Sequence, residues 1–220
     1  MVALSLNNLA EALQEAGIRQ AFTPDVSRMT VELWRQIATG NPISPKQVDQ
    51  IADNLGISRE VAHSIIQKMC ERDAEGNIVG VAGLSQKKHP HRFRVNGIRL
   101  STWCALDALF LPVALKQSVQ VESLCPQTKQ KIQLTITPDG VQQYDPASAA
   151  ISIVVPSPTQ GGLESVEEIW MTFCNHIHFF SSQDAAREWF TRGGQEITVL
   201  SIEKGFEVGR LALEEVLQYA

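Results

Sequence analysis

The sequence predicts an α+β protein in which a helical, winged-helix-like N-terminal domain precedes a mixed β-sheet domain with flanking helices. Two observations predict this class. Up to about residue 72, apolar residues recur with the spacing of amphipathic helices. Beyond residue 101, short stretches alternate apolar and polar residues, which is typical of strands. The change of pattern predicts a helical, winged-helix-like domain at 1–84 and an α+β domain at 85–220.

Four helices are predicted before the first strand. Apolar residues at positions 6, 9, 10 and 13 form one face of the first helix, and Gly17 ends it. Pro45 stands at the first position of the third helix, and Ser58 caps the fourth. The expected ranges are 4–16, 25–39, 45–55 and 59–72.

The third and fourth helices, joined by a turn at Gly56 and Ile57, have the helix-turn-helix pattern. Strands at 75–85 and 91–101 would complete a winged helix. The charges of the fourth helix cancel, whereas a DNA-reading helix usually presents a basic face. The feature that favours DNA is a basic run in and after the loop between the strands: Lys87, Lys88, Arg92 and Arg94. Such a run is more often a solvated hairpin tip, so we expect no nucleic-acid partner.

The remaining elements are predicted from periodicity and from Gly and Pro positions. A helix at 103–115, stopped or kinked near Pro112, precedes a hairpin of strands at 118–125 and 131–138. Residues 168–180 begin polar and end as a strand-like apolar run. The other expected elements are a strand at 149–156, a surface loop at 156–162, a helix at 183–192 closed by Gly193 and Gly194, a strand at 196–202 and a helix at 203–218.

Composition limits the class of protein. The chain has 220 residues, of which 44% are hydrophobic and 20% are charged, as in ordinary globular proteins. A net charge of −5 argues against an overall design for nucleic acid or anionic membrane. The N-terminal residues lack the basic start and unbroken apolar run of a signal peptide, and no stretch approaches the ~20 apolar residues of a membrane span. We expect a cytoplasmic protein with no membrane partner.

Four cysteines, Cys70, Cys104, Cys125 and Cys174, form no C-x-x-C pair, so a zinc ribbon or thioredoxin-like motif is not indicated. In a reducing compartment an even number of cysteines does not indicate disulfides. Free cysteines are usually small buried hydrophobic residues. Each cysteine therefore needs a neighbour with suitable chemistry before it becomes a candidate site.

The stretch TWCALDALF at 102–110 supplies such a neighbour. Cys104 and Asp107 stand three residues apart, so a helix places them on one face. Because Cys104 would lie in the first turn, the positive end of the helix dipole is expected to lower its thiol pKa. The alternative is a buried cysteine with a solvated aspartate, and the motif alone favours that alternative.

The stretch FCNHIHFF at 173–180 is a second candidate. On a strand, Cys174, His176 and His178 would share one face and could ligate zinc or copper. Residues i and i+4 on a strand are about 13 Å apart, however, too far to share one ion without a bulge. This favours structural histidines.

Cys104 and Cys174 would form a different kind of site if the fold united them. With Asp107 beside them, the set holds two soft ligands and one group that carries a proton. Such a set suits a thiophilic metal better than hydrolysis. A cysteine protease would need a histidine base, and no signature of that class flanks these cysteines.

The motifs RLSTWCALDALFLPVAL at 99–115, VESLCP at 121–126 and MTFCNHIHFF at 171–180 resemble those of the organomercurial (alkylmercury) lyases. The N-terminal helices and EGNIVGVAGLS at 75–85 also look like that family's first domain, so the resemblance covers essentially the whole chain. It implies protonolysis of the carbon–mercury bond, which releases a hydrocarbon and Hg(II).

The resemblance also implies roles for particular residues. Cys104 and Cys174 match the family's catalytic cysteines, which bind mercury, and Asp107 matches its catalytic aspartate. Cys125 matches a cysteine that looks structural, and Cys70 falls outside every motif. No organic cofactor is implied. Low-molecular-weight thiols would carry mercury in and out, and mercuric reductase would receive Hg(II).

One residue departs from the pattern of some family members. Asn175 stands where some members of the family carry a further cysteine, and we infer no loss of activity from this. The winged-helix-like domain looks like architecture that covers the sheet domain. The alternative function is a metal-responsive winged-helix regulator or a soft-metal-binding protein.

Overall fold

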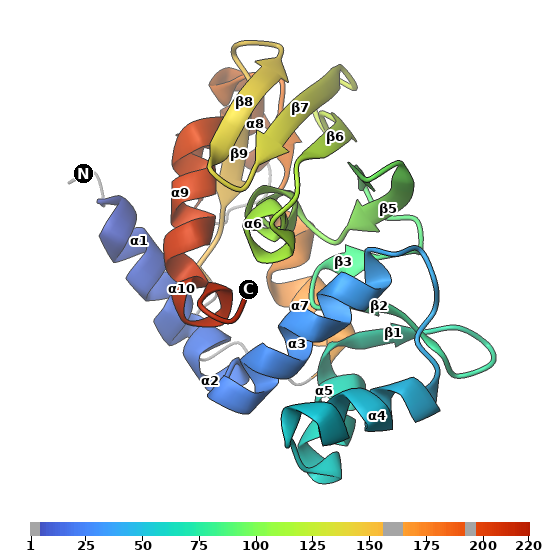
Figure 1. The fold of residues 1–220 in the computed structure, drawn as a ribbon. Coiled ribbons are helices and arrows are strands. Elements are labelled where there is room, and N and C mark those ends of the chain that lie inside the picture. The colour runs from blue at the N-terminus through green and yellow to red at the C-terminus, as the bar shows by residue number, and fades with distance from the viewer. Residues whose placement is uncertain (1–4, 156–164, 192–196) are drawn as a thin grey trace.

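The computed structural model describes residues 5–155, 165–191 and 197–220. Helices and antiparallel sheets alternate along the chain, and the α+β class predicted from the sequence is confirmed. In Figure 1 the helix α6 (Ala105–Leu115) lies near the centre, with strands β6–β8 above it and α3–α5 below. The predicted loop at 156–162 and the helix end at Gly193 and Gly194 lie outside the described residues.

The N-terminal helices follow their capping signals. Ser44 forms a capping box with Gln47 at the start of α4, and the Ser58 side chain accepts the Val61 N–H at the start of α5. The bounds are α1 Leu6–Leu13, a π-helical segment Gln14–Ile18, α2 Arg19–Ala21, α3 Pro24–Ile37, α4 Pro45–Leu55 and α5 Arg59–Met69. The fourth helix is predicted to end at Arg72. That end is wrong, because Cys70–Arg72 form strand β1, which pairs with β2 (Ile78–Val81).

An eight-stranded sheet has the order β1-β2-β3-β5-β4-β6-β7-β8. Its strands are β1 Cys70–Arg72, β2 Ile78–Val81, β3 Leu84–Ser85, β4 His91–Val95, β5 Ile98–Thr102, β6 Val119–Leu124, β7 Lys131–Thr137 and β8 Gly140–Asp145. Every strand pair described in this sheet is antiparallel. The expectation of a mixed sheet, with parallel as well as antiparallel pairs, is therefore wrong. The expected boundary after residue 84 falls inside β3, and the two-domain division stays a prediction.

Two stretches expected as single strands are hairpins. Asn96 and Gly97 both have positive φ, 48° and 79°, and this tight turn separates β4 from β5. An Asn-Gly pair between apolar runs is a strong hairpin signal. Ala82 and Gly83 likewise separate β2 from β3. The prediction treated both turns as strand interior, and it also missed β8.

A second sheet has the order β10-β9-β11, formed by β9 Ala150–Ile153, β10 Phe179–Phe180 and β11 Thr198–Ser201. The strand expected near 172–180 is mostly wrong. That stretch contains the end of α7 (Val166–Thr172), a 3₁₀ turn at Cys174–His176 and only a short β10. The last helices are α8 Gln183–Thr191, α9 Ile202–Ala212 and α10 Glu214–Leu217.

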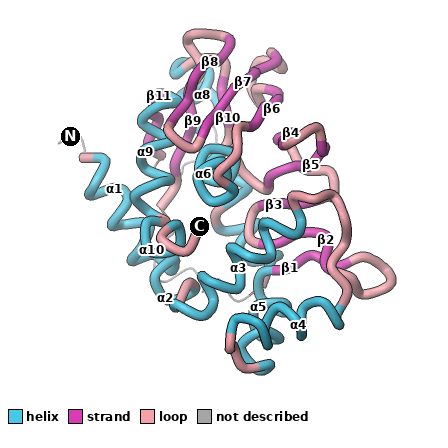
Figure 2. Tube along the Cα trace, viewed as in Figure 1, coloured by secondary structure: helices cyan, strands magenta, loops and turns pink. Residues whose placement is uncertain are grey.

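The core surrounds α6, which is buried at almost every position and continues through Pro112. Figure 2 shows α6 among helices and strands, and it contacts α3, α9, β4 and β7. In β7 the inward residues Ile132, Leu134 and Ile136 are buried and alternate with exposed or half-buried ones. Among the residues that the structure describes, none of the helices is long and apolar enough to cross a bilayer.

Candidate functional site

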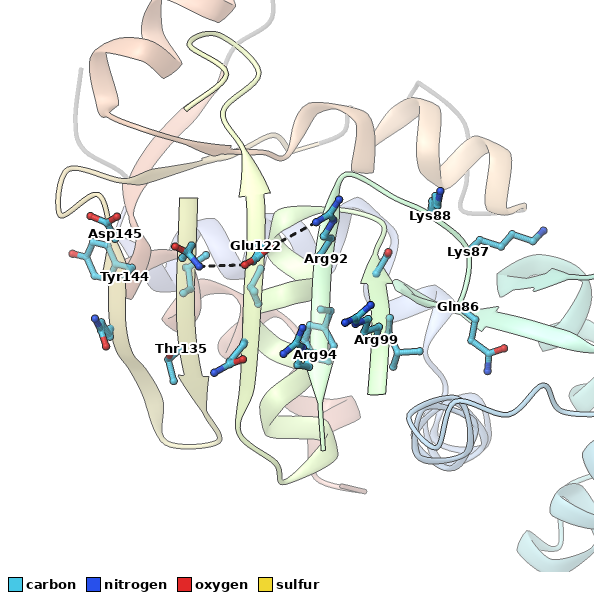
Figure 3. Close-up of a pocket in the computed structure, with 18 residues that line it drawn as sticks. Gln86, Lys87, Lys88, Arg92, Arg94, Arg99, Glu122, Thr135, Tyr144 and Asp145 are labelled. Carbon is cyan, nitrogen blue, oxygen red and sulfur yellow. Dashed lines mark hydrogen bonds and ion pairs between the residues drawn. The ribbon is translucent and has the colours of Figure 1, made fainter. Parts of the chain in front are cut away.

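A broad hollow lies on the outer face of the eight-stranded sheet, with a volume of about 950 Å³. We call it the sheet groove, and Figure 3 shows the arginine side chains of β4 and β5 projecting along it. Its basic lining residues are Lys87, Lys88, Arg92, Arg94 and Arg99. Neither cysteine nor histidine lines it, so the predicted site residues lie elsewhere.

Cys104, Asp107 and Cys174 meet in the interior. One sulfur or oxygen atom from each lies within 4.8 Å of the others, and all three residues are buried. Within the described part of the chain, no other group of at least three His, Cys, Asp or Glu side chains converges in this way. The fold therefore unites two soft ligands with one carboxyl group.

Cys104 and Asp107 are held by the start of α6. Cys104 is the N-cap residue, and its backbone N–H donates to Asp107 Oδ2 at 2.8 Å. In return, the Cys104 sulfur accepts from the backbone N–H of Asp107. The two side chains thus satisfy the free N–H groups of the first turn reciprocally. The aspartate is 8% exposed, which excludes the alternative of a solvated carboxylate.

Cys174 comes from the 3₁₀ turn that follows α7. The backbone N–H of Ala105, the first residue of α6, donates to Ile177 O at 3.1 Å. This bond ties the segment that carries Cys174 to the helix start that carries Cys104. Further along the same segment, β10 begins at Phe179 and pairs with β9.

The two nearby histidines do not share a strand face with Cys174. His178 Nε2 lies 2.8 Å from Asn175 O, and His176 Nε2 lies 3.1 Å from Met171 O. Because a carbonyl oxygen only accepts, each of these ring nitrogens carries its proton and is not free to bind a metal. The strand geometry expected for Cys174, His176 and His178 is wrong.

Gly83 makes room for Asp107, and sequence reasoning missed it. A Cβ at Gly83 would lie 2.5 Å from Asp107 Cγ, and Gly83 has a φ of +100°. Both the close approach and the left-handed conformation require glycine. The backbone N–H of Trp103 also donates to Gly83 O at 2.9 Å. The Val-Ala-Gly turn in the sequence is the signal that could have indicated this close contact.

Burial dominates the electrostatics of the cluster. It raises the pKa of Asp107 to about 7, although hydrogen bonds from Cys104 act in the opposite direction. Burial raises the pKa of Cys104 well above its usual value. The hydrogen bond from Cys104 is the largest single influence on Cys174 and lowers its pKa, but burial and the nearby Asp107 charge together outweigh it, so the net direction is upward. The expectation that the helix dipole supplies a thiolate at Cys104 is therefore wrong for the unliganded chain.

A small pocket, which we call the site pocket, opens onto this cluster, with a volume of about 80 Å³. Gly83, Trp103, Asp107 and Cys174 line its inner end. Its other walls are apolar: Leu13, Ala16, Ile18, Phe22, Met69, Ala82, Leu106, Phe110, Ile169, Phe173 and Leu213. The arrangement can bind a soft cation beside a proton donor and surround an attached apolar group.

Residues 84–214 match the family model described as "MerB: Alkylmercury lyase". The chain is also 36% identical to an alkylmercury lyase of Staphylococcus epidermidis over 81% of its length and 78% of that relative. The chain belongs to the alkylmercury lyase family. An alkylmercury lyase of Pseudomonas putida is 32% identical over 96% of this chain and 92% of its own length. The family resemblance inferred from the motifs is confirmed.

A solved structure described as "Crystal structure of the mercury-bound form of MerB2" has the same fold as this family member. Its TM-score is 0.74, at 22% identity, covering 96% of this chain and 98% of that one. The likeness extends over the N-terminal helices as well as the sheets. The winged-helix description of those helices stays a prediction.

The two other cysteines of this alkylmercury lyase family member lie outside the cluster. Cys125 occupies the turn after β6, where its sulfur accepts from Thr128 N–H at 3.4 Å and from Ser181 O–H at 3.6 Å. Cys70, in β1, is 8% exposed, and burial raises its pKa to about 12. Both are buried, as expected from their residue type.

Proposed function

We propose that this chain is an organomercurial lyase that cleaves the carbon–mercury bond of R–Hg⁺ by protonolysis, with Cys104, Asp107 and Cys174 as the catalytic residues. The observation that carries this proposal is the convergence of two thiols and one carboxyl group within 4.8 Å in a buried site. Family membership supports the reaction class. Mercury enters as part of the substrate and leaves as product.

Cys104 and Cys174 bind mercury in this scheme. Thiolate sulfur is the natural ligand of a soft cation. In the unliganded chain both thiols hold their protons, because burial raises the pKa of Cys104, and burial together with the Asp107 charge raises that of Cys174. Mercury displaces these protons as each Hg–S bond forms. The two thiolates then donate electron density to mercury, which makes the attached carbon more basic.

Asp107 carries the proton from thiol to carbon. With a pKa of about 7 it can both accept and release a proton near neutrality, as a general acid–base requires. Its oxygen lies within 4.8 Å of both sulfurs. When the carbon–mercury bond breaks, its electron pair stays on carbon, which takes the proton from Asp107. The released product is the hydrocarbon R–H.

The overall step is balanced without an oxidant or reductant. R–Hg⁺ and two cysteine thiols give R–H, a mercury bis-thiolate and one H⁺. Low-molecular-weight thiols would then exchange with the cysteines to remove Hg(II), and mercuric reductase is the proposed recipient. The scheme uses no organic cofactor.

The site pocket would hold the organic group R. Most of its walls are apolar side chains from the first helices, α6, α7 and the start of α10. An apolar wall favours a hydrocarbon group and excludes water, which strengthens electrostatic interactions during bond cleavage. Its volume of about 80 Å³ favours a small R group, unless the walls move.

The test is hydrocarbon release from an organomercurial by the full chain and by Cys104→Ser, Cys174→Ser and Asp107→Ala. We expect turnover to be lost in each variant, measured by gas chromatography of the released hydrocarbon. Cys70→Ala is the matched control, because Cys70 is a buried cysteine outside the cluster, and its turnover should persist. Turnover retained in any of the three site variants would contradict the assigned roles.

The alternative function, a metal-responsive regulator, depended on the basic residues near the predicted wing. In the structure, Lys87, Lys88 and Arg92 line the sheet groove and do not lie on α5, the second helix of the predicted helix-turn-helix. A regulator would bind a duplex with strong salt dependence, and that binding would weaken when these three residues are neutralised. A gel-shift assay at low salt with no retarded band would dispose of this alternative.

A further inference from the structure

Glu71 is a half-buried residue outside the three-residue cluster. It lies in β1, and its side chain is 10% exposed. His89 Nε2 lies 3.1 Å from Glu71 Oε1, and the Trp103 indole N–H donates to Glu71 Oε2 at 3.0 Å. Ser85 hydrogen-bonds the same carboxylate. The proposed catalytic steps do not use this carboxylate or its three hydrogen-bond partners.

These partners keep Glu71 ionised. Burial raises the pKa of the carboxyl group, but hydrogen bonds from His89, Ser85 and Trp103 together outweigh it, so the net direction is downward. An ionised carboxylate only accepts hydrogen bonds. His89 Nε2 therefore carries its proton and donates it to Glu71. Removing one partner of such a half-buried pair leaves the other unpaired and is costly.

One side of this network reaches the segment that carries Cys104. Trp103 directly precedes Cys104, is 2% exposed, and lines the site pocket. Its indole is fixed by Glu71, and its backbone N–H donates to Gly83 O. The residue before the N-cap of α6 is thus held at both its side chain and its backbone.

The other side reaches the segment that carries Cys174. The His89 ring packs against the Trp170 ring, with centroids 5.6 Å apart and planes inclined by 41°. Trp170 belongs to α7, and the 3₁₀ turn with Cys174 follows that helix. Glu71 therefore lies at the junction of two chains of contact, one to each cysteine-bearing segment.

The end of β2 and the turn that follows it leave space for the carboxyl groups of Glu71 and Asp107. A Cβ at Gly80 would overlap Glu71 Oε2, just as a Cβ at Gly83 would overlap the Asp107 carboxyl group. The two glycines stand at the two ends of the Gly-Val-Ala-Gly sequence. One short segment thus leaves space for the proton-carrying aspartate and for the half-buried glutamate behind it.

We infer that Glu71 is a positioning residue of the lyase site: through Trp103 and through the His89–Trp170 contact it holds Cys104 and Cys174 at the separation needed to bind one mercury ion together. The inference rests on the proposed function. Glu71 touches neither substrate nor reacting atoms in this account. It fixes the relative position of two segments that are 70 residues apart in the chain, from Cys104 to Cys174.

The test compares Glu71→Gln with Glu122→Gln in the full chain. Glu122 lies in β6 of the same sheet and forms ion pairs with Arg92 and Lys131, but it lines the sheet groove rather than the site. For Glu71→Gln we expect kcat for an organomercurial to fall by about 10- to 100-fold, as small misplacements of reacting groups do. KM should change by less than about two-fold, since Trp103 is the one described wall residue that Glu71 hydrogen-bonds and the other apolar walls are unaffected. Glu122→Gln should match the unmodified chain.

A second readout separates positioning from general loss of stability. Bis-thiolate coordination of Hg(II) gives ultraviolet charge-transfer absorption, and a competing dithiol should remove Hg(II) from Glu71→Gln at lower concentration than from the unmodified chain. A purely structural role would lower the melting temperature without changing this competition or kcat well below that temperature. Glu71→Gln with unchanged kcat and unchanged competition would overturn the inference.

Trp103→Phe and His89→Phe keep a ring and remove one hydrogen bond each, so they test the two sides separately even if Glu71→Gln does not fold. Glu71→Gln leaves one acceptor oxygen for the two donors His89 and Trp103, so it weakens the network from which Trp103→Phe removes a bond, and their effects on kcat should be less than additive. Unchanged kcat in both ring variants would also overturn the inference. If the unmodified chain releases no hydrocarbon, the proposed function fails instead.

Discussion

The sheet groove and the site pocket differ in size and in chemistry. The groove has a volume of about 950 Å³ and is lined by charged and polar side chains that water can reach. The pocket has a volume of about 80 Å³ and is lined by the buried Cys174 and the buried Asp107, with Cys104 directly beside them. The larger hollow has the more conspicuous charges, yet the smaller one holds Asp107, a carboxyl group whose pKa burial raises.

The difference follows from solvation. Glu122 in the groove interacts with Arg92 and Lys131 in exposed positions, where ion pairs contribute about 0–1 kcal/mol. In the site pocket, burial moves the pKa of Asp107 from 3.8 to about 7. Carboxyl groups in the two hollows therefore have different chemistry because of their surroundings. The proposed site is therefore marked by desolvated ionisable groups rather than by the size of its cavity.

The largest expected effect comes from Asp107→Asn, which keeps the shape of the side chain and removes the proton relay. We expect hydrocarbon release to fall by about 10²- to 10⁴-fold, the range typical of general acid–base groups. The same variant should gain stability at alkaline pH, because it no longer confines an ionisable carboxyl group in the interior. Hydrocarbon release and thermal unfolding measure the two effects.

The sign of the pH dependence follows from the folded-state pKa. For Asp107 this pKa, about 7, lies above the ordinary value of 3.8, so the protonated form favours folding. Its contribution is complete below about pH 4 and is lost as the pH rises through 7, on the order of a few kcal/mol. The stability difference between Asp107→Asn and the unmodified chain should therefore widen from pH 4 to pH 8. A constant difference would contradict the raised pKa.

Gly83→Ala should have the next largest effect, because it tests how closely the turn approaches the site. A Cβ there would overlap the Asp107 carboxyl group, so we expect loss of activity and destabilisation by about 1–3 kcal/mol from overpacking, with backbone strain in addition. Gly97→Ala is the matched control, since Gly97 also has a positive φ but its Cβ would meet nothing within 4 Å. The control should lose stability from strain and keep its activity. Equal activity loss in both variants would remove the special role of Gly83.

Phe173→Ala should have a smaller effect that depends on the substrate. Phe173 lines the site pocket next to Cys174. Replacing its ring with a methyl group enlarges the pocket and removes part of its apolar wall. We expect kcat/KM to fall for small alkylmercury compounds by about 10- to 100-fold at most, as is typical when apolar contacts with a substrate are lost. Aryl compounds should lose less, because the enlarged space admits a ring. Steady-state kinetics with a methyl and a phenyl mercurial distinguish the two, and equal losses would contradict the pocket assignment.

The smallest effect is expected in the sheet groove. Arg94 and Arg99 stand directly opposite each other on β4 and β5. Like charges in this position destabilise a sheet by about 0.2–1 kcal/mol. Arg94→Gln combined with Arg99→Gln should therefore raise the unfolding free energy slightly at low salt and leave kcat unchanged. A fall in kcat would show that the groove takes part in turnover, and the contrast between the two hollows would then fail.

Local features were predictable from the sequence where the information lies within one element. Ser44 and Ser58 mark the starts of α4 and α5, and the spacing of Cys104 and Asp107 places them on one helical turn. The strand assignment around Cys174 failed because Cys174 and Ile177 are apolar residues buried in and after a 3₁₀ turn, not in a strand. An apolar run is the same signal for a strand and for a buried turn.

Features that depend on contacts between distant segments were not predictable. The direction of the Cys104 pKa shift depends on burial, which outweighs the helix dipole and is not visible in the local sequence. The closeness of Gly83 to Asp107 joins two different elements. The proximity of Cys104 and Cys174 could be inferred only from the family resemblance. Periodicity and residue type carry no information on such distances.

The complete burial of Cys104 has a consequence for the resting protein. Peroxides and alkylating agents react with cysteine as the thiolate, and both need access to the sulfur. A fully covered, protonated thiol meets neither condition, so the cluster should withstand oxidative damage that would inactivate an exposed cysteine pair. A thiophilic cation can displace the protons by itself, and this would reserve the reactivity of the two sulfurs for heavy metals.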